Sequence, residues 1–197
     1  MRTLFTLDAQ NYDPDAPLHI RPSVRAVIIR DGRILMVHIR KFDYYKFPGG
    51  GLEPGESHEE ALCREVQEEA GFTVVPGSIR EYGLVHRKER DDDGTTFVQD
   101  NFYYLCAVAA AVGQNLDDYE ADQGFNPEFV DPRHAIETNL CHDHFGKESA
   151  MFPREPGVLK CLLEERYLRS FHEPAVFRRL FSLPPQSDGK NGSLALY

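Results

Sequence analysis

Three glutamates that stand close together in the chain have the clearest potential for chemistry. Glu65, Glu68 and Glu69 occupy positions i, i+3 and i+4, and side chains at these offsets share one face of a helix. Three ionised carboxylates within one turn repel each other unless a cation lies among them. An all-oxygen ligand set favours a hard divalent ion, Mg²⁺ or Mn²⁺. The spacing therefore indicates a metal site suited to a substrate that carries phosphate oxygens.

Local signals predict a helix with defined ends around these glutamates. Ser57 and Glu60 form an S-x-x-E capping box, which places the start of the helix directly after Ser57. Gly71 stands where a C-terminal cap with positive φ is expected. The glycines at 49–51 allow the backbone to approach a metal or a phosphate closely. The segment is therefore expected to be a glycine-rich loop followed by a capped helix.

The stretch from Gly50 to Phe72 resembles the Nudix box, G-x5-E-x7-R-E-U-x-E-E-x-G-U, where U is a bulky apolar residue. Every position of the pattern is filled, and the matching residues are Gly50, Glu56, Arg64, Glu65, Val66, Glu68, Glu69, Gly71 and Phe72. With about 7% usage per residue type, the fixed identities amount to a chance of about 10⁻⁸ per starting position. The chain is therefore identified by resemblance as a member of the Nudix hydrolase superfamily.

The resemblance implies a metal-dependent hydrolase that cleaves a diphosphate linkage in a nucleoside diphosphate derivative. Its expected cofactor is Mg²⁺ or Mn²⁺, and its expected partner is a small-molecule substrate. The metal ligands that carry over are Glu65, Glu68, Glu69 and the backbone carbonyl of Gly50 or Gly49. The catalytic base varies among members of the family, and here it is expected to be Glu65 or Glu68.

Two further positions have alternative interpretations. Arg64 is either a catalytic organiser that holds box carboxylates such as Glu56, or a surface ion pair with Glu68 at i+4. Some Nudix proteins add a carboxylate from a loop far downstream, for which this chain offers Glu120, Asp122 and Glu128. Glu128 directly precedes an apolar strand and is preferred as a metal ligand, although a surface charge explains it equally well.

Substrate contacts are expected near the glycine loop and in a basic cluster. Lys46 precedes the loop and can meet a phosphate, while Tyr45 either stacks on a ring of the substrate or packs against the hairpin. Arg87 lies in the cluster at 86–90, which either binds phosphate or balances the aspartates at 91–93. The proline and tyrosine markers of two Nudix subtypes are not met here, so no particular nucleotide is indicated.

Two other functions fit the same fold. A nucleotide-ligand sensor is expected to lose the box carboxylates and to carry a DNA-binding domain, whereas this chain keeps the carboxylates. An isoprenoid diphosphate isomerase needs a catalytic Cys and Glu pair, for which Cys63 or Cys106 would have to serve. Isomerases usually depart from the strict box, so the hydrolase is favoured.

Composition agrees with a globular enzyme of one domain. The chain has 197 residues, of which 41% are hydrophobic and 27% charged, both ordinary values. Its formal net charge of −10 argues against binding to nucleic acid polymers or anionic membranes. Scattered cysteines, without a signal peptide or a membrane-spanning run, favour a cytoplasmic location. Family members are often homodimers, and the terminal additions are candidate contacts.

The pattern and the resemblance together predict an α/β fold, a Nudix-type α/β/α sandwich with a mixed β-sheet between helices. One domain is expected over residues 1–183, with helical additions at both ends, followed by a flexible tail at 184–197. Strands are expected at 4–7, 24–29, 33–39, 73–75, 79–87, 97–108 and 128–130. A loop is expected at 113–127, and helices are expected from Pro132 onwards and at 157–172. The Asp31-Gly32 pair predicts a hairpin.

Overall fold

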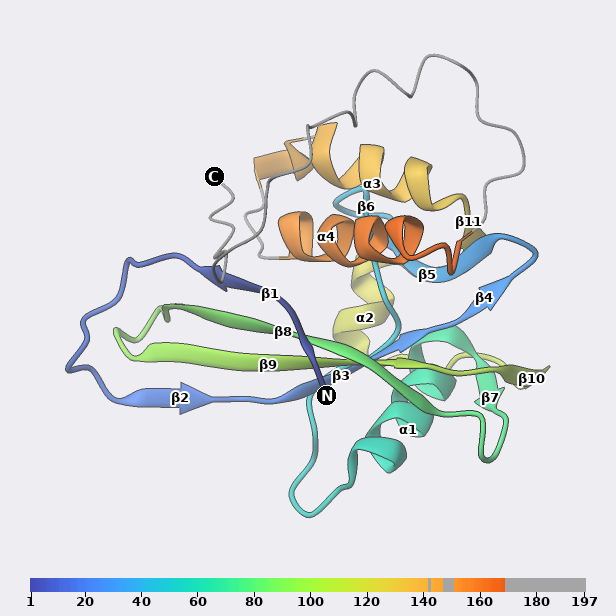
Figure 1. The fold of residues 1–197 in the computed structure, drawn as a ribbon, viewed down its shortest axis with the longest axis horizontal. Coiled ribbons are helices and arrows are strands. Elements are labelled where there is room, and N and C mark those ends of the chain that lie inside the picture. Colours follow the sequence, from blue (N-terminus) through green and yellow to red (C-terminus); the bar gives the residue numbers. More distant parts are fainter. Residues whose placement is uncertain (142, 147–150, 169–197) are drawn as a thin grey trace.

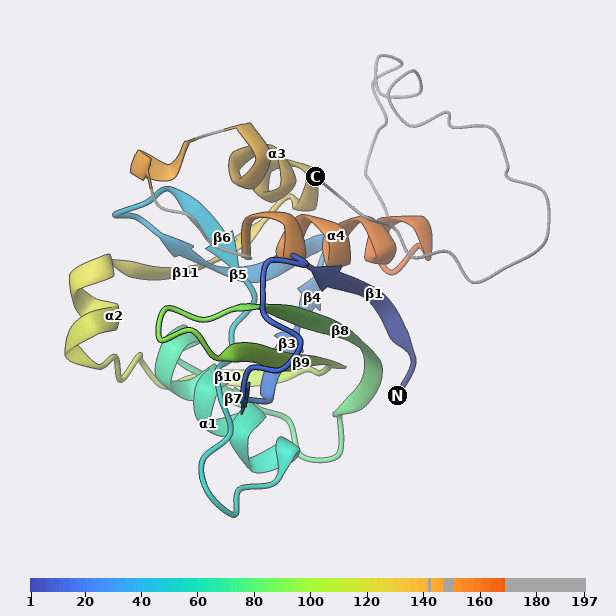
Figure 2. The same cartoon turned by 90° about the vertical axis from the view of Figure 1, so that its left-hand side faces the viewer.

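A computed structural model describes residues 1–141, 143–146 and 151–168. Its strands lie between two layers of helices (Figure 1; Figure 2). On one side are α3 (Pro132–Cys141) and α4 (Met151–Glu164), and on the other side is α1 (His58–Ala70). The predicted α/β/α sandwich is therefore confirmed.

The larger sheet is built around a long antiparallel hairpin of β8 and β9, which extends beyond the helical layers (Figure 1). The strands β1, β2 and β3 each pair in parallel with one strand of this hairpin, so the sheet is mixed, as predicted. The bounds are β1 (Thr3–Asp8), β8 (Arg80–Arg90), β9 (Thr96–Leu105), β2 (Leu18–Ile20) and β3 (Ser23–Val27).

A second sheet and a short ladder complete the middle layer, where a single sheet was expected. The second sheet has the order β11-β5-β4, with β6 paired to β5, and β10 pairs with β7. Asp31 and Gly32 join β4 to β5 with φ values of 51° and 73°, which confirms the predicted hairpin. The bounds are β4 (Ile29–Arg30), β5 (Arg33–Ile39), β6 (Tyr44–Lys46), β7 (Phe72–Val74), β10 (Val108–Ala111) and β11 (Phe125–Val130).

The long strand predicted at 97–108 is interrupted. β9 ends at Leu105 and β10 begins at Val108. Between them the backbone changes partner: Cys106 N–H donates to the Val27 carbonyl at 3.1 Å, and the Ala107 carbonyl accepts from Val75 N–H at 2.8 Å. A continuous apolar run does not reveal such a change, because both partners bury the same kind of side chain.

The loop predicted at 113–127 is wrong, because this stretch contains α2 (Asp118–Gln123) and the start of β11. Asp117 caps α2 through a capping box with Glu120, and Gly124 ends it in the left-handed region with φ 69°. The short sequence D-x-x-E followed by glycine is the signal that indicates this helix.

The predicted helix at 157–172 corresponds to α4, which begins earlier, at Met151, and ends at Glu164. A short 3-10 helix, His144–Gly146, lies between α3 and the start of α4 in the chain. The end of the domain expected at 183 and the tail expected at 184–197 lie outside the described residues, so the extent of the domain stays a prediction. Among the described residues, no helix has the length and apolar character needed to cross a bilayer.

The strand β3 is buried on both faces and separates the two halves of the core. Val24 and Ala26 pack in the cluster that contains Leu62 and Val66 of α1. Val27 belongs instead to the cluster on the side of α4. Because side chains alternate along a strand, the polar residues of β3 that share the face of Val27 point toward α4.

Candidate active site

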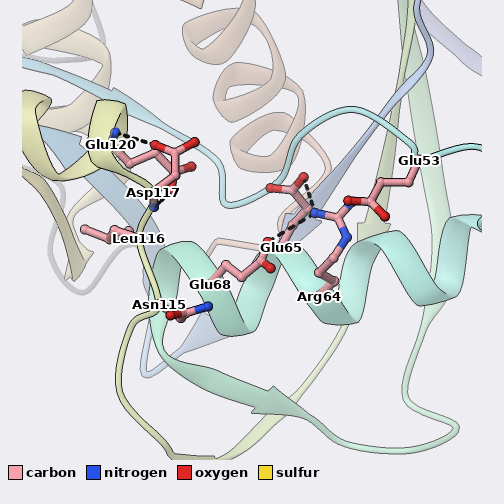
Figure 3. Close-up of a pocket in the computed structure, with 8 residues that line it drawn as sticks. All are labelled: Glu53, Arg64, Glu65, Glu68, Asn115, Leu116, Asp117 and Glu120. Carbon is pink, nitrogen blue, oxygen red and sulfur yellow. Dashed lines mark hydrogen bonds and ion pairs between the residues drawn. The ribbon is translucent and has the colours of Figure 1, made fainter.

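Helix α1 has the ends that its sequence predicts. The Ser57 side chain accepts a hydrogen bond from Glu60 N–H, and the Glu60 carboxylate accepts one from Ser57 N–H. Gly71 ends the helix with φ 71°, and its N–H donates to the Gln67 carbonyl at 3.0 Å. These caps set the position of the helix in the chain, so that Arg64, Glu65 and Glu68 face one cavity (Figure 3).

The guanidinium of Arg64 links three carboxylates. Its Nε and Nη2 atoms donate to Oε1 and Oε2 of Glu56 at 2.8 and 2.9 Å. Its Nη1 atom donates to Glu65 Oε1 at 2.9 Å and to Glu68 Oε2 at 3.1 Å. The hydrogen bonds from Arg64 lower the pKa of Glu56 to about 2, and the same bonds raise the pKa of Arg64. Arg64 thus contacts Glu56, as an organiser would, and also Glu68 at i+4, while its catalytic role stays a prediction.

Glu65 lies against the glycine loop with little exposure to solvent. A Cβ atom added at Gly50 would collide with the Glu65 carboxylate, so glycine is required for this close approach. Burial raises the pKa of Glu65, and the nearby charge of Glu69 adds to the effect. The Gly50 carbonyl accepts a hydrogen bond from Val24 N–H at 3.0 Å, which leaves its second lone pair.

Glu69 lies deeper than its two neighbours, with 2% of its surface exposed. Its Oε2 atom accepts a hydrogen bond from Gly49 N–H at 2.9 Å, and its Oε1 atom pairs with the Lys46 ammonium. The Lys46 Nζ atom also lies 4.8 Å from the centre of the Phe125 ring. Lys46 is thus near the box carboxylates, but its charge neutralises Glu69 instead of facing open solvent.

A cavity of about 350 Å³ lies beside α1. Its opposite wall comes from α2 and the residues just before that helix (Figure 3). Asp117 and Glu120 cap each other there, with N–H to carboxylate distances of 2.7 and 3.0 Å. Burial raises the pKa of Glu120 to about 7. The lining residues are Glu53, Arg64, Glu65, Glu68, Asn115, Leu116, Asp117 and Glu120.

The groups around this cavity suit a hard divalent cation. Glu65, Glu68 and Glu120 offer carboxylate oxygens, which Mg²⁺ and Mn²⁺ prefer. Burial raises the pKa of Glu65 and of Glu120 and so disfavours their ionised forms, which a nearby cation would favour. Within the described part of the chain, no three His, Cys, Asp or Glu side chains are already placed to hold an ion together, and Arg64 contacts both Glu65 and Glu68.

Glu128 and Tyr45, which the sequence analysis assigned to the site, lie apart from the cavity. The Tyr45 hydroxyl donates to Glu128 Oε1 at 3.1 Å. Tyr45 is 4% exposed, and its ring contacts His134 of α3 at 5.9 Å between centroids. Phe129, the neighbour of Glu128 on β11, packs instead against Phe72 and the cluster on the α1 side. Both predicted residues therefore lie on the sheet face opposite the box helix.

Arg87, the third predicted substrate contact, lies on the β8–β9 hairpin. Its guanidinium pairs with Glu89 and lies 5.0 Å from the centre of the Phe97 ring. It is not among the residues that line the cavity. Arg87 thus pairs with Glu89, not with the aspartates at 91–93 that the sequence analysis named, and its contact with phosphate stays a prediction.

The sequence analysis missed the cavity wall at 115–117. Asn115 N–H donates to the Glu68 carbonyl at 3.0 Å, which holds this segment against α1. Asp117 lies in the region that was expected to be a loop, and the capping box with Glu120 is the signal that could have located it. Asn115 and Leu116 have no comparable signal, since their place depends on a contact between distant parts of the chain.

Parts of two curated proteins are similar in sequence to this chain. Over 70 residues the chain is 39% identical to a CTP pyrophosphohydrolase from Escherichia coli (strain K12), covering 34% of this chain and 50% of that protein. Over 61 residues it is 40% identical to an RNA pyrophosphohydrolase from Pseudomonas putida (strain GB-1), covering 30% of this chain and 36% of that protein. The matches thus span half or less of these curated relatives.

The fold and the family model extend the likeness beyond the box. A solved structure described as a NUDIX hydrolase from Nitrosomonas europaea superposes with a TM-score of 0.52 and 25% sequence identity. The superposition covers 76% of this chain and 90% of that one. The family model of the NUDIX domain matches residues 19–147, which include the capped helix, the glycine loop and the cavity wall. Because this match covers more than half of the chain, the protein belongs to the NUDIX domain family.

Proposed function

We propose that this protein is a metal-dependent pyrophosphohydrolase that cleaves a diphosphate linkage in a nucleoside diphosphate derivative. The observation that carries the proposal is the arrangement of Glu65 and Glu68 on α1 across one cavity from Glu120 on α2. The printed names of the two curated relatives, a CTP and an RNA pyrophosphohydrolase, support a substrate with a nucleotide diphosphate bond.

The proposed cation is Mg²⁺ or Mn²⁺, held by Glu65 and Glu68 with the carbonyl of Gly50. When bound, such an ion neutralises the charge on phosphate oxygens and lowers the pKa of an attacking water. Glu120 extends the ligand set from the opposite wall and takes the place that the sequence analysis gave to Glu128. Both carboxylate oxygens of Glu69 are already engaged, one by the Lys46 ammonium and one by Gly49 N–H. Glu69 would therefore bind the ion only if one of these two contacts were broken.

The residues of this chain have distinct roles in the proposed reaction. Arg64 orients the carboxylates, because one planar guanidinium contacts Glu56, Glu65 and Glu68 and fixes their relative positions. Glu65 or Glu68 accepts the proton of the attacking water, since both line the cavity. The remaining carboxylate would help to hold the cation, and Arg64 is the cationic side chain among the described residues that line the cavity.

The two alternative functions are less well supported. An isomerase needs a cysteine in the reaction cavity, yet neither Cys63 nor Cys106 is among the described residues that line it. Burial also raises the pKa of Cys106 to about 12, which keeps the thiol protonated and unreactive. A sensor has no need of the clustered carboxylates that this cavity retains.

A panel of nucleotide derivatives, assayed for phosphate or nucleotide release with Mg²⁺ and with Mn²⁺, tests the proposal. The parent is expected to hydrolyse at least one compound, with no turnover in a chelator. Glu65→Gln and Glu68→Gln should each lower kcat by about 10²–10⁴-fold. Glu59→Gln is the matched control, because Glu59 is an exposed carboxylate on the same helix and should leave kcat unchanged.

Two results would contradict the proposed function. If Glu65→Gln and Glu68→Gln both fold and turn over as fast as Glu59→Gln, these carboxylates do not hold the metal. If the parent hydrolyses none of the compounds but binds one tightly, the sensor becomes the better interpretation.

A further inference from the structure

The glycine loop is held to β3 by three successive carbonyl groups. The Pro48 carbonyl accepts a hydrogen bond from Ala26 N–H at 2.8 Å, and the Gly50 carbonyl accepts one from Val24 N–H at 3.0 Å. The carbonyl between them, at Gly49, accepts a hydrogen bond from the Arg25 guanidinium instead. The Arg25 side chain therefore supplies the hydrogen bond to Gly49 that the backbone of β3 does not make.

The Gly49 peptide unit is held from both ends. Its N–H donates to Glu69 Oε2 at 2.9 Å, while its carbonyl is bound by Arg25. The site tolerates only glycine, because a Cβ atom there would collide with the backbone of Val24, and φ is 138°. The next residue, Gly50, abuts the Glu65 carboxylate. A small movement of this peptide would therefore displace the contacts of both Glu65 and Glu69.

Arg25 is buried on the side of β3 that faces α4, with 7% of its surface exposed. Its charge interacts there with Glu155 and Arg154 of α4 and with Tyr103 of β9. Within the described part of the chain, its Nε atom finds no hydrogen-bond partner. Burying a guanidinium is costly unless its charge is used in specific contacts. The contact with Gly49 links it to the candidate active site, and its charge also interacts with Glu69 there.

We propose that Arg25 is a positioning residue, which holds the Gly49–Gly50 bend so that the Gly50 carbonyl and Glu65 keep the positions needed for a divalent cation. This inference rests on the proposed function. Arg25 does not line the cavity and touches no substrate, so its effect passes through the glycine loop. A purely structural role in the core would instead change stability and leave cation binding intact.

Binding of Mn²⁺, measured by calorimetry on the full chain, separates these two roles. Arg25→Met removes the donor, and about 10–100-fold weaker Mn²⁺ binding is expected, as for other residues that orient metal ligands. Arg25→Lys keeps a charged donor without the planar fork, so partial recovery of Mn²⁺ affinity is expected. The melting temperature of each variant is recorded in the same buffers.

Tyr103→Phe is the matched control. Tyr103 is fully buried, and its hydroxyl donates to Glu155 Oε2 at 3.1 Å, so the variant disturbs the same buried group without touching the loop. It should lower the melting temperature and leave Mn²⁺ affinity unchanged. If Arg25→Met does not fold, Arg25→Lys alone decides, because weaker Mn²⁺ binding than in Tyr103→Phe is still expected.

Two outcomes overturn the proposal, and they are distinguishable. If the parent binds Mn²⁺ and Arg25→Met (or Arg25→Lys, where Arg25→Met does not fold) binds it as tightly as Tyr103→Phe does, Arg25 is structural while the proposed function stands. If the parent binds no Mn²⁺ and hydrolyses nothing, the proposed function fails, and the role of Arg25 fails with it.

Discussion

At the scale of single residues, the site is a set of acidic groups kept together by two basic side chains. Arg64 lies among Glu56, Glu65 and Glu68, and Lys46 pairs with the buried Glu69. Without these partners, like charges in one turn of α1 would repel and strain the helix. The Arg64 and Lys46 side chains therefore explain how the folded chain holds these carboxylates close together.

Arg64→Lys tests whether the shape of the guanidinium matters beyond its charge. An ammonium cannot form the bidentate pair with Glu56 and also reach Glu65 and Glu68. We expect kcat/KM to fall by about 10–100-fold in a steady-state assay. Arg80→Lys is the control, because the Arg80 side chain donates to nearby backbone carbonyls outside the cavity. Equal activity of the two variants would argue against an organising role for Arg64.

Glu120→Gln tests the environment of the opposite cavity wall. The folded pKa of Glu120 is about 7, above its ordinary 4.5, because burial disfavours the ionised form. Between these values the folded state binds more protons than the unfolded state, so stability falls as pH rises. Glutamine cannot ionise and still fits the capping box. Urea midpoints of the chelated protein at about pH 5 and about pH 8 should therefore drop less in Glu120→Gln than in the parent. An unchanged drop would contradict the burial of this carboxyl.

At the scale of elements, two short capped helices form the opposing walls of the cavity. α1 begins at a capping box and ends at Gly71, and α2 begins at a capping box and ends at Gly124. The end of α1 also anchors the chain that leads toward α2, since Val112 N–H donates to the Gly71 carbonyl at 2.8 Å. The distance between the walls therefore depends on how α1 ends.

Gly71→Ala should destabilise the protein more than Gly77→Ala. Both glycines have φ 71°, so alanine pays a similar backbone cost of about 1–2 kcal/mol at each position. At Gly71 the new Cβ atom would also lie 2.9 Å from the Gly113 backbone, whereas at Gly77 it meets open space. Overpacking adds about 1–3 kcal/mol. Urea unfolding measures the difference, and equal losses would show that Gly113 moves aside freely.

At the scale of the whole molecule, the formal net charge is −10, and several of its carboxylates line a single cavity. A divalent cation that binds there adds its binding free energy to the stability of the folded state.

Burial also affects the cysteines, because it raises the pKa of the Cys63, Cys106 and Cys161 thiols. All four cysteines are free in the described part of the chain.

Magnesium should raise the melting temperature of the parent above its value in a chelator. At a concentration 100 times Kd, binding stabilises the folded state by about 2.7 kcal/mol, or about 5–10 °C for a domain of this size. Glu68→Gln should reduce this shift, since it removes one charge that faces the cavity. NaCl at matched ionic strength controls for screening of the net charge. An equal shift in NaCl or in the variant would show that the stabilisation is not site-specific.

The fold and part of the site could be predicted because their signals are local. The helix caps at Ser57 and Gly71, the Asp31-Gly32 hairpin and the spacing of the box carboxylates each depend on neighbours a few residues apart. The expected loop at 113–127 was wrong although it contained a local signal, the capping box of α2. The break between β9 and β10 had no such signal, because it arises from a change of pairing partner.

The sequence by itself determined which carboxylates lie on one face of α1, since the period of the helix follows from the backbone alone. Only the tertiary structure decided that Glu120, and not Glu128, faces them, because strand β11 turns Glu128 toward α3. Alternation along β6 likewise requires Lys46 and Tyr45 to point in opposite directions, yet does not specify which one reaches Glu69. Which face each side chain takes depends on how segments distant in the sequence pack against each other, and the free energy of that packing depends on the whole chain.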